Sequence, residues 1–460
     1  MTLRRFAALA LTGVLTAGCG LDEPGAVQVR YTGSTPAPVG DVAGFTWAVE
    51  REPRSLDWLR GGGVPEDTVT ANLCERLVRL GDNGMPEPGL AASVANPDPL
   101  TWVYRLRAGV RFHDGRELTA GDAVASLRRS AAQRGAHTFD KVAAIEATGP
   151  LEVTLRLRQP DPLLNHALTG NAGVVASAAY LAEHRDDYGS PSTSDGCSGP
   201  FRVGAWEPGS HVLLTRFEEY WDPARRARAG SVRFDFAAGP ALTNALVSGR
   251  VDGAYLPSPT PIVRLARLQT GKVYFGTSAA VAALAPAPGG AFEDPLRRRA
   301  LSLVLDRELI AREAYAGLAE PTEPPRTEGR GTVLAAGEWP QPGSVAPGLD
   351  EAKALLAQAG PLDREVVISG AEGLEAAAVA SAVLEACQRL GLPARIGTGD
   401  PDLALVTGAP APNDPAWARW VPVARLPNTL YLGNRLTGAP PSSSYLGQAW
   451  AARIGRSAVN

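Results

Sequence analysis

Apolar and polar positions alternate along several short segments in the first half of the chain, as they do in β-strands that bury one face. Residues 151–157 (LEVTLRL) alternate strictly, and residues 232–236 (VRFDF) do so again. Residues 102–106 and 110–112 are further short strand candidates, and Asp114-Gly115 after them is a turn signal. These segments predict a sheet with one face in water.

Two helix starts are marked by capping residues. Thr119 followed by Asp122 has the spacing of a capping box and predicts a helix at this point. Asp294 followed by Pro295 is an N-cap with proline at the first helical position. Apolar residues then recur at helical spacing, at Leu296, Ala300, Leu303 and Val304. Strands and helices are therefore mixed along the chain.

The C-terminal half has the pattern of a βαβ unit. Residues 366–369 and 392–396 are strand candidates, and the segment between them, about 372–390, is predicted as a helix closed by Gly391. Residues 403–406 are a further apolar strand. We therefore expect an α/β lobe in this half.

Length and charge narrow the class of protein. The 460 residues correspond to about three domains, or two large lobes, at about 150 residues per domain. With 45 basic and 48 acidic residues the net charge is -3. The basic footprint of a nucleic-acid-binding protein is missing, so nucleic acid is not an expected partner.

The N-terminus has the layout of a secretory signal. Arg4 and Arg5 precede an apolar run at 6–15, and the small residues 16–18 lead to Cys19. As a helix the run is only about 15 Å long against a hydrocarbon core of about 30 Å, which argues against a transmembrane span. The sequence LTAGC resembles the bacterial lipobox, which implies cleavage after residue 18 and lipidation of Cys19. An ordinary cleavage site with an incidental cysteine is the alternative.

The segment after Cys19 is predicted to be a tether. Residues 20–40 are rich in glycine, proline, serine and threonine and have no sustained periodicity. We expect residues 19–40 to connect the lipid anchor to a folded body that starts near Phe45.

The common catalytic motifs are missing. The sequence has no GxxxxGK[ST], GxGxxG, HExxH or CxxC motif. Residues 196–199 (GCSG) are one residue short of the GxSxG nucleophile elbow. No two histidines have the spacing of metal ligands on one helix face; they are His113, His137, His166, His184 and His211. We therefore expect no enzyme, no metal site and no cofactor.

Several motifs resemble one family in its own order along the chain. Residues 52–57 (EPRSLD) match a P-x-S-L-D opening, and residues 104–124 (YRLRAGVRFHDGRELTAGDAV) match a strand, an FHDG turn and a TA-x-DV helix start. Residues 199–209 (GPFRVGAWEPG) and 294–310 (DPLRRRALSLVLDRELI) match two later blocks. The chain thereby resembles, over about 45–438, the oligopeptide and dipeptide family of bacterial extracytoplasmic solute-binding proteins, which serve ABC importers.

The resemblance implies an α/β, two-lobed periplasmic-binding-protein type II fold with an inserted subdomain and a cleft between the lobes. A ligand would lie in the cleft, which a hinge motion closes. By this resemblance lobe I comprises 41–75, 166–258 and 416–460, the inserted subdomain 76–165, and lobe II 259–415.

The resemblance also implies ligand-binding positions. Gly63 and Val64 match a loop whose backbone faces the peptide, and the segment from Gly408 through Ala409 to Asp414 matches the one that holds the peptide's amino end. The family's pattern in this segment is GW-x-AD-x-x-DP, and this chain has GAPAPNDP instead. Ala409 occupies the position of the tryptophan, and Pro412 that of the first aspartate. The anchoring carboxylate is then either Asp414 or missing.

Three cysteines remain after lipidation of Cys19. Cys387 lies on the apolar side of the predicted helix and is expected in the core. Cys74 and Cys197 flank the inserted subdomain, and export to an oxidising compartment makes a disulfide between them a possible pairing.

These observations favour a monomeric extracytoplasmic lipoprotein that captures a peptide-like ligand and delivers it to the membrane subunits of an ABC importer. Three alternatives remain. One is a binder of a metal chelate, haem or an oligosaccharide. The others are a sensor or chaperone lipoprotein without a transport role, and a secreted hydrolase.

Overall fold

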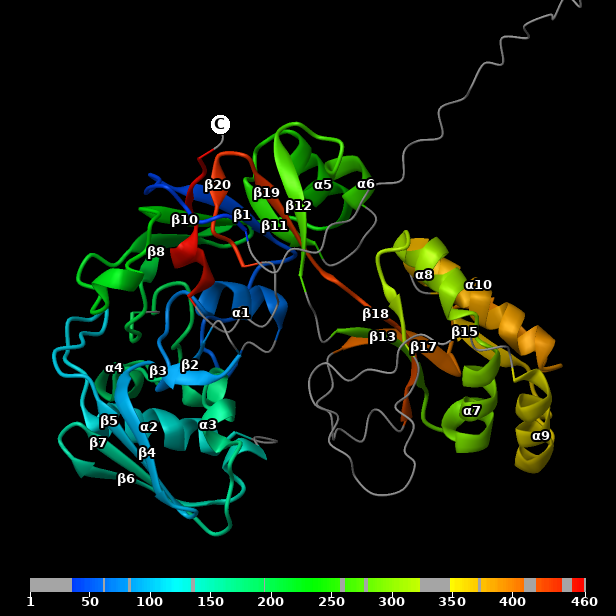
Figure 1. The fold of residues 1–460 in the computed structure, drawn as a ribbon, viewed down its shortest axis with the longest axis horizontal. Coiled ribbons are helices and arrows are strands. Elements are labelled where there is room, and N and C mark those ends of the chain that lie inside the picture. Colours follow the sequence, from blue (N-terminus) through cyan, green and yellow to red (C-terminus); the bar gives the residue numbers. More distant parts are fainter. Residues whose placement is uncertain are drawn as a thin grey trace, which may run out of the picture.

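The chain folds into two lobes, each built on its own large sheet (Figure 1). The structure is a computed structural model. The residues it describes are 35–60, 63–81, 84–133, 137–193, 195–256, 261–276, 280–322, 348–370, 374–408, 419–440 and 449–458.

The first lobe contains a seven-stranded sheet in the order β12-β19-β11-β1-β10-β9-β8. The central strand β1 pairs in parallel with β10 and β11, and the outer strands pair antiparallel. The bounds are β1 Phe45–Val49, β8 Phe201–Glu207, β9 His211–Arg216, β10 Ser231–Phe236, β11 Gly253–Leu256, β12 Gly271–Gly276 and β19 Asn428–Gly433. Trp47 and Phe234, on paired strands, are completely buried in its core.

The second lobe contains a six-stranded sheet in the order β14-β18-β13-β17-β15-β16. Its strands are β13 Val281–Pro286, β14 Glu320–Pro321, β15 Val366–Ser369, β16 Ala394–Gly397, β17 Leu403–Gly408 and β18 Val421–Arg425. Its helices are α7 Pro295–Val304, α8 Arg307–Tyr315, α9 Leu349–Ala359 and α10 Leu374–Arg389. The parallel pair β15 and β16 with α10 between them is the predicted βαβ unit.

A four-stranded antiparallel sheet, β4-β5-β7-β6, forms a separate layer within the first lobe (Figure 1). Its elements are β4 Ala91–Asp98, β5 Thr101–Leu106, β6 Val142–Gly149, β7 Glu152–Leu157 and the helix α2 Ala120–Ala131. Tyr104, Leu127 and Leu155 belong to its core and have no exposed surface.

Short elements complete the fold. The remaining helices are α1 Val64–Thr70, α3 Leu164–Ala167, α4 Ala178–Glu183, α5 Gly239–Val247 and α6 Ile262–Leu265, with 3₁₀ turns at His137–Phe139, Asn171–Gly173, Pro223–Arg225, Ala291–Glu293 and Trp450–Arg453. The remaining strands are β2 Val78–Leu80, β3 Pro86–Pro88, β20 Leu436–Thr437 and β21 Gly455–Arg456.

Both predicted helix caps are confirmed. The Thr119 side chain accepts from the Asp122 N–H, and the Asp122 carboxylate accepts in return from the Thr119 N–H. Asp294 accepts hydrogen bonds from the N–H groups of Leu296 and Arg297 at the start of α7. Side-chain oxygens thereby satisfy N–H groups that have no partner inside the helix.

The strand expected at 110–112 is not formed. Its backbone folds into a tight hairpin, in which the Phe112 N–H bonds to the Arg116 carbonyl and the Leu118 N–H to the Val110 carbonyl. A single bridge joins Arg111 to Glu117. The turn passes through Gly115 at φ 86°, a left-handed conformation that glycine adopts without strain.

The predicted lobe boundaries at 258/259 and 415/416 are wrong at two strands. β12 was expected in lobe II but pairs with β19 in the first sheet. β18 was expected in lobe I but pairs with β13 in the second sheet. The partner of a strand depends on tertiary structure, so the local pattern did not reveal these exchanges.

The predicted tether also ends earlier than residue 40. The hydroxyl of Thr35 donates to the Ala439 carbonyl at 2.9 Å, and the Val39 N–H donates to the Arg456 carbonyl at 3.0 Å. Residues 35–40 are therefore fixed against the C-terminal part of the first lobe.

Candidate ligand-binding site

Two segments connect the lobes, and they run side by side. Gly276 pairs with Asn428 in the first sheet, and Val281 pairs with Arg425 in the second. Between these pairs the Leu426 N–H donates to the Ala280 carbonyl at 2.9 Å. Figure 1 shows β18 leading out of the second lobe toward β19 in the first. A change in the angle between the lobes must therefore be absorbed in a few residues of this paired connection.

The predicted loop of the first lobe forms the start of α1. Gly63 is the N-cap residue in an extended conformation, and Pro65 occupies the first turn. The Val64 side chain is 60% exposed, which is unusual for valine in this fold. The beginning of α1 thus presents one apolar side chain to solvent.

An ion pair lies directly behind Gly63. Arg51 donates to the two carboxylate oxygens of Glu66 at 2.6 and 2.9 Å, and the Arg54 N–H donates to the same carboxylate at 3.0 Å. A Cβ atom on Gly63 would lie 2.9 Å from both the Arg51 and the Glu66 side chains. A side chain at position 63 would therefore displace the ion pair.

The electrostatics of Glu66 favour its ionised form. Its side chain is 1% exposed, and burial by itself raises the pKa of a carboxyl group. The hydrogen bonds from Arg51 and from the Arg54 N–H outweigh burial, and the pKa of Glu66 lies below its ordinary value. The carboxylate is consequently a fixed structural charge and is already occupied by its partners.

Aromatic side chains hold α1 against the first sheet. Trp47 on β1 packs against Tyr255 and Trp450, with ring centroids 5.4 and 4.6 Å away, and these two rings also contact each other. The Trp450 indole N–H donates to the carbonyl of Thr68 on α1 at 3.0 Å. This packing fixes the position of α1 relative to the first sheet, and with it the position of Gly63 and Val64.

On the second lobe, Gly408 ends β17 beside the connection between the lobes. It pairs with Val281, which pairs in turn with Arg425 on β18. The segment predicted to hold an amino group therefore starts next to the crossing strands. Ala409 and Asp414 lie outside the described residues.

The predicted site residues belong to different lobes. Gly63 and Val64 are in the first lobe and Gly408 is in the second, so a ligand that contacts both must lie between the lobes. Arg51 was not among the predicted residues, because it lies 15 positions before Glu66 and no local pattern signals the contact. The one available signal in the sequence was Glu66, an acidic residue directly after Pro65 at the start of the helix.

A disulfide and the FHDG turn lie in the core of the first lobe, and the free cysteine lies in the second lobe. The structure joins Cys74 to Cys197 by a disulfide with Cα atoms 4.8 Å apart, and Cys387 is buried as a free thiol. His113 is buried and its Nε2 lies 3.0 Å from the Gly199 carbonyl, and burial lowers the pKa of His113 to about 4. Cys19 lies outside the described residues.

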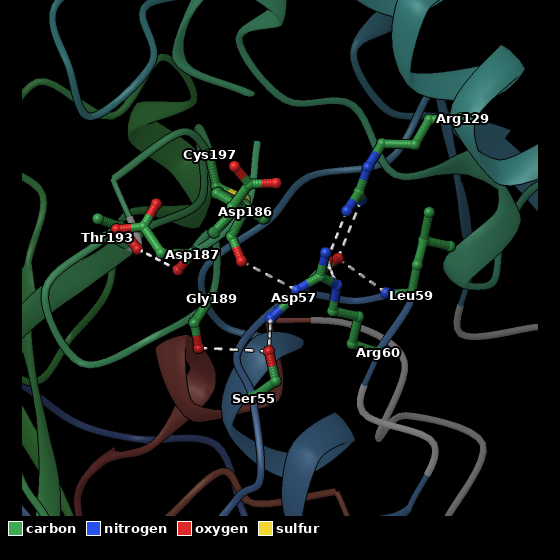
Figure 2. Close-up of polar contacts among 11 residues, drawn as sticks. Ser55, Asp57, Leu59, Arg60, Arg129, Asp186, Asp187, Gly189, Thr193 and Cys197 are labelled. Carbon is green, nitrogen blue, oxygen red and sulfur yellow. Dashed lines mark hydrogen bonds and ion pairs between the residues drawn. The ribbon is translucent and has the colours of Figure 1, made fainter. Parts of the chain in front are cut away.

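The P-x-S-L-D motif is a packing element (Figure 2). Asp57 accepts hydrogen bonds from Arg129 on α2 and from the Leu59 N–H. The Ser55 hydroxyl donates to the Gly189 carbonyl and accepts from the Asp57 N–H. The motif thus joins α2 and the segment at Gly189 to the part of the first lobe that follows β1.

Within the described ranges, no three His, Cys, Asp or Glu side chains gather where they could hold a metal ion. The same part of the chain has no helix of the length and apolarity that crossing a membrane requires.

Comparisons with known proteins agree on one family. The family described as "Bacterial extracellular solute-binding proteins, family 5 Middle" matches residues 85–420. The periplasmic oligopeptide-binding protein OppA of Salmonella typhimurium is 25% identical over 338 residues, which cover 67% of this chain and 61% of OppA. The chain therefore matches less than two thirds of this relative's length.

Solved structures share the fold at lower identity. AgaA from A. tumefacien R10, solved with agropinic acid, has a TM-score of 0.73 at 19% identity and covers 91% of this chain and 99% of its own. The oligopeptide-binding protein AppA from Bacillus subtilis, solved with a nonapeptide, has a TM-score of 0.72 at 16% identity, with 91% and 100% covered. The predicted two-lobed α/β fold is confirmed. The chain belongs to the bacterial extracellular solute-binding proteins of family 5.

Proposed function

We propose that this protein is an extracytoplasmic solute-binding protein that holds a peptide-like ligand between its two lobes and delivers it to an ABC importer. The observation that carries the proposal is the placement of Gly63 and Val64 on one lobe and Gly408 on the other, beside a short paired connection. A ligand bound there contacts both lobes and stabilises their approach. Membership of the family supports the same role.

Backbone recognition suits a peptide ligand. The start of α1 offers backbone groups and a single exposed apolar side chain, Val64. Backbone groups pair with the amides of any peptide and leave its side chains unspecified. The similar OppA is named as an oligopeptide-binding protein, and AppA was solved with a nonapeptide.

The amino end of the ligand is the point at which this chain departs from its family. A buried ammonium without a partner costs about 3 to 5 kcal/mol, or roughly a hundred- to several-thousand-fold in affinity. Pro412 cannot supply the carboxylate. We propose that Asp414 supplies it or that selection for a free amine is absent.

A small acidic solute is the second candidate ligand. AgaA, which has the same fold at a TM-score of 0.73, was solved with agropinic acid. The loss of the family's first aspartate at Pro412 removes a negative charge from the segment that follows Gly408 and so favours a ligand without a free amine.

Calorimetry tests whether the site selects a free amino group and whether Asp414 holds it. Matched peptides with free and N-acetylated amino ends are titrated into the wild type and into Asp414→Asn. A free-amine preference that disappears in Asp414→Asn supports the carboxylate anchor. A preference that survives the substitution contradicts it, and equal binding of both peptides supports a ligand without an amine requirement.

The proposal extends to the membrane anchor and to the absence of enzymatic activity. The apolar run before Cys19 and the LTAGC sequence support lipidation at Cys19 and attachment at the outer face of the cell membrane. Labelling with a fatty acid in the bacterial host should be lost in Cys19→Ser. Full labelling of that variant would contradict the anchor, and hydrolytic turnover by the pure protein would contradict a purely binding role.

A further inference from the structure

A second site lies within the first lobe, away from the connection between the lobes. It is a cavity of about 630 Å³ between the N-terminal residues 35–38, the segment 74–79 that follows α1, and the C-terminal 3₁₀ turn. Six arginines line it: Arg76, Arg79, Arg225, Arg226, Arg228 and Arg453. Among the described lining residues the one carboxylate is Glu75. A cavity of this volume is large enough for a small organic molecule.

Carboxylates outside the cavity form ion pairs with three of these arginines. Arg79 and Arg225 both contact Glu87 at 2.8 Å. Arg226 contacts Glu218 and Asp41, each at 3.1 Å. These three arginines are held at the rim by their partners and contribute less to binding an anion.

Arg76 is different, because its guanidinium is buried and has no carboxylate within ion-pair distance in the described part of the chain. It donates to the Cys74 carbonyl at 3.1 Å and to the Asn171 amide oxygen at 3.2 Å, and its Nε–H has no partner. Burial lowers the pKa of Arg76 to about 10. A buried guanidinium that bonds only to neutral acceptors is poorly compensated, and an anion would compensate it.

The charges of Glu75 and Asp67 act to raise the pKa of Arg76, but neither carboxylate forms an ion pair with it in the described part of the chain. The Glu75 carboxylate accepts a hydrogen bond from the Tyr220 hydroxyl at 2.5 Å and makes no ion pair with the lining arginines that the structure describes. The exposed Arg228 side chain has no hydrogen bond or ion pair to any described residue. Two cationic groups of the cavity are thus available to a ligand.

We propose that this cavity binds a phosphate-bearing organic anion, with Arg76 and Arg228 as its ligands. Guanidinium groups match phosphate oxygens in geometry and bind them through paired hydrogen bonds. Pro36, Pro38 and Trp450 supply an apolar wall for the organic part. The site is independent of the ligand proposed between the lobes.

The anion has two possible sources with the same chemistry. One is a soluble phosphate compound. The other is a phospholipid headgroup, because residues 35–38 line the cavity and the chain before them leads back to Cys19, the predicted anchor. A headgroup in the cavity would hold the first lobe against the membrane surface.

The test uses the full mature chain with Cys19→Ser, so that no lipid anchor contributes. One arm titrates inorganic pyrophosphate by calorimetry, and the other measures co-sedimentation with phosphatidylglycerol vesicles against phosphatidylcholine vesicles. Arg228→Gln should weaken binding about tenfold or more, because a hydrogen bond to a charged group is lost. Arg299→Gln, an exposed arginine of the second lobe paired with Glu351, is the matched control and should bind as before.

Binding in the pyrophosphate arm identifies a soluble ligand, and binding in the vesicle arm alone identifies a headgroup. Either result supports the site if Arg228→Gln weakens the binding and Arg299→Gln leaves the binding unchanged. No binding in either arm overturns the proposal, as does unchanged binding by Arg228→Gln. Because Arg228 is exposed, this variant should keep the thermal stability of the wild type.

Discussion

The carboxylate of Asp57 and the guanidinium of Arg129 form an ion pair with two hydrogen bonds, at 2.9 and 2.5 Å, which connects the segment after β1 to α2 (Figure 2). Asp57 has no exposed surface. The Arg129 guanidinium also lies 4.8 Å from the ring of Trp58. The residue order of the P-x-S-L-D segment is thus explained by its packing against α2.

Asp57→Asn should destabilise the protein by about 3 kcal/mol, because Arg129 then keeps a partly buried charge without its partner. Urea unfolding measures the change. The control is Glu152→Gln, which removes the exposed pair with Arg105 and should cost less than about 1 kcal/mol. Equal losses in the two variants would show that the Asp57 pair has no special role.

The pair between Arg51 and Glu66 predicts a pH dependence. The pKa of Glu66 is below its ordinary value in the folded chain, so its stabilising contribution is present above the unfolded pKa and is lost as the pH falls through the folded pKa. Arg51→Gln should therefore melt below the wild type at pH 7, and the difference should shrink in acid below about pH 4. Melting curves of both proteins between pH 7 and pH 3 measure it. A constant difference across this range would contradict the assignment.

Gly63→Ala should destabilise the start of α1, because the new Cβ would lie 2.9 Å from the side chains of Arg51 and Glu66. We expect a lower melting temperature and weaker ligand binding. Val64→Ala changes an exposed side chain next to it and should leave the melting temperature within about 1 °C, since surface changes of this kind alter stability little. If both variants melt like the wild type, the ion pair does not constrain residue 63.

The disulfide predicts the thiol count of the exported protein. With Cys74 bonded to Cys197, denatured and unreduced protein should show one reactive thiol, Cys387, once Cys19 is blocked by lipid. Three thiols would show that the bond is absent. Replacing both bonded cysteines by alanine should lower the free energy of unfolding by about 4 to 5 kcal/mol, because the bond closes a loop of 123 residues.

Local sequence patterns predicted the elements of this fold better than their partners. The alternation at 151–157 corresponds to β7, because a strand with one buried face needs a period of two. The capping residues before α2 and α7 were recognisable for the same local reason. The lobes to which β12 and β18 belong were not recognisable from the sequence, since each strand pairs with a strand far away in the chain.

The candidate site was predicted only in part. Gly63, Val64 and Gly408 were identified through resemblance to a family, and the structure places them on the two lobes. The contacts that shape the site, Arg51 with Glu66 and Trp47 with Trp450, join residues separated by 15 and about 400 positions. No periodicity links such residues, because their contact depends on how the completed elements pack.

Native mass spectrometry of the protein purified from its bacterial host tests the central claim most directly. The account predicts one or more discrete non-covalent solutes on the wild type, lost on unfolding. The solute held between the lobes should also be lost in Val64→Arg, which places a bulky charge at the exposed start of α1, and retained in Arg228→Gln, which alters only the arginine-lined cavity. A wild type that never carries a solute, or a solute that survives both Val64→Arg and Arg228→Gln, would contradict a ligand held between the lobes.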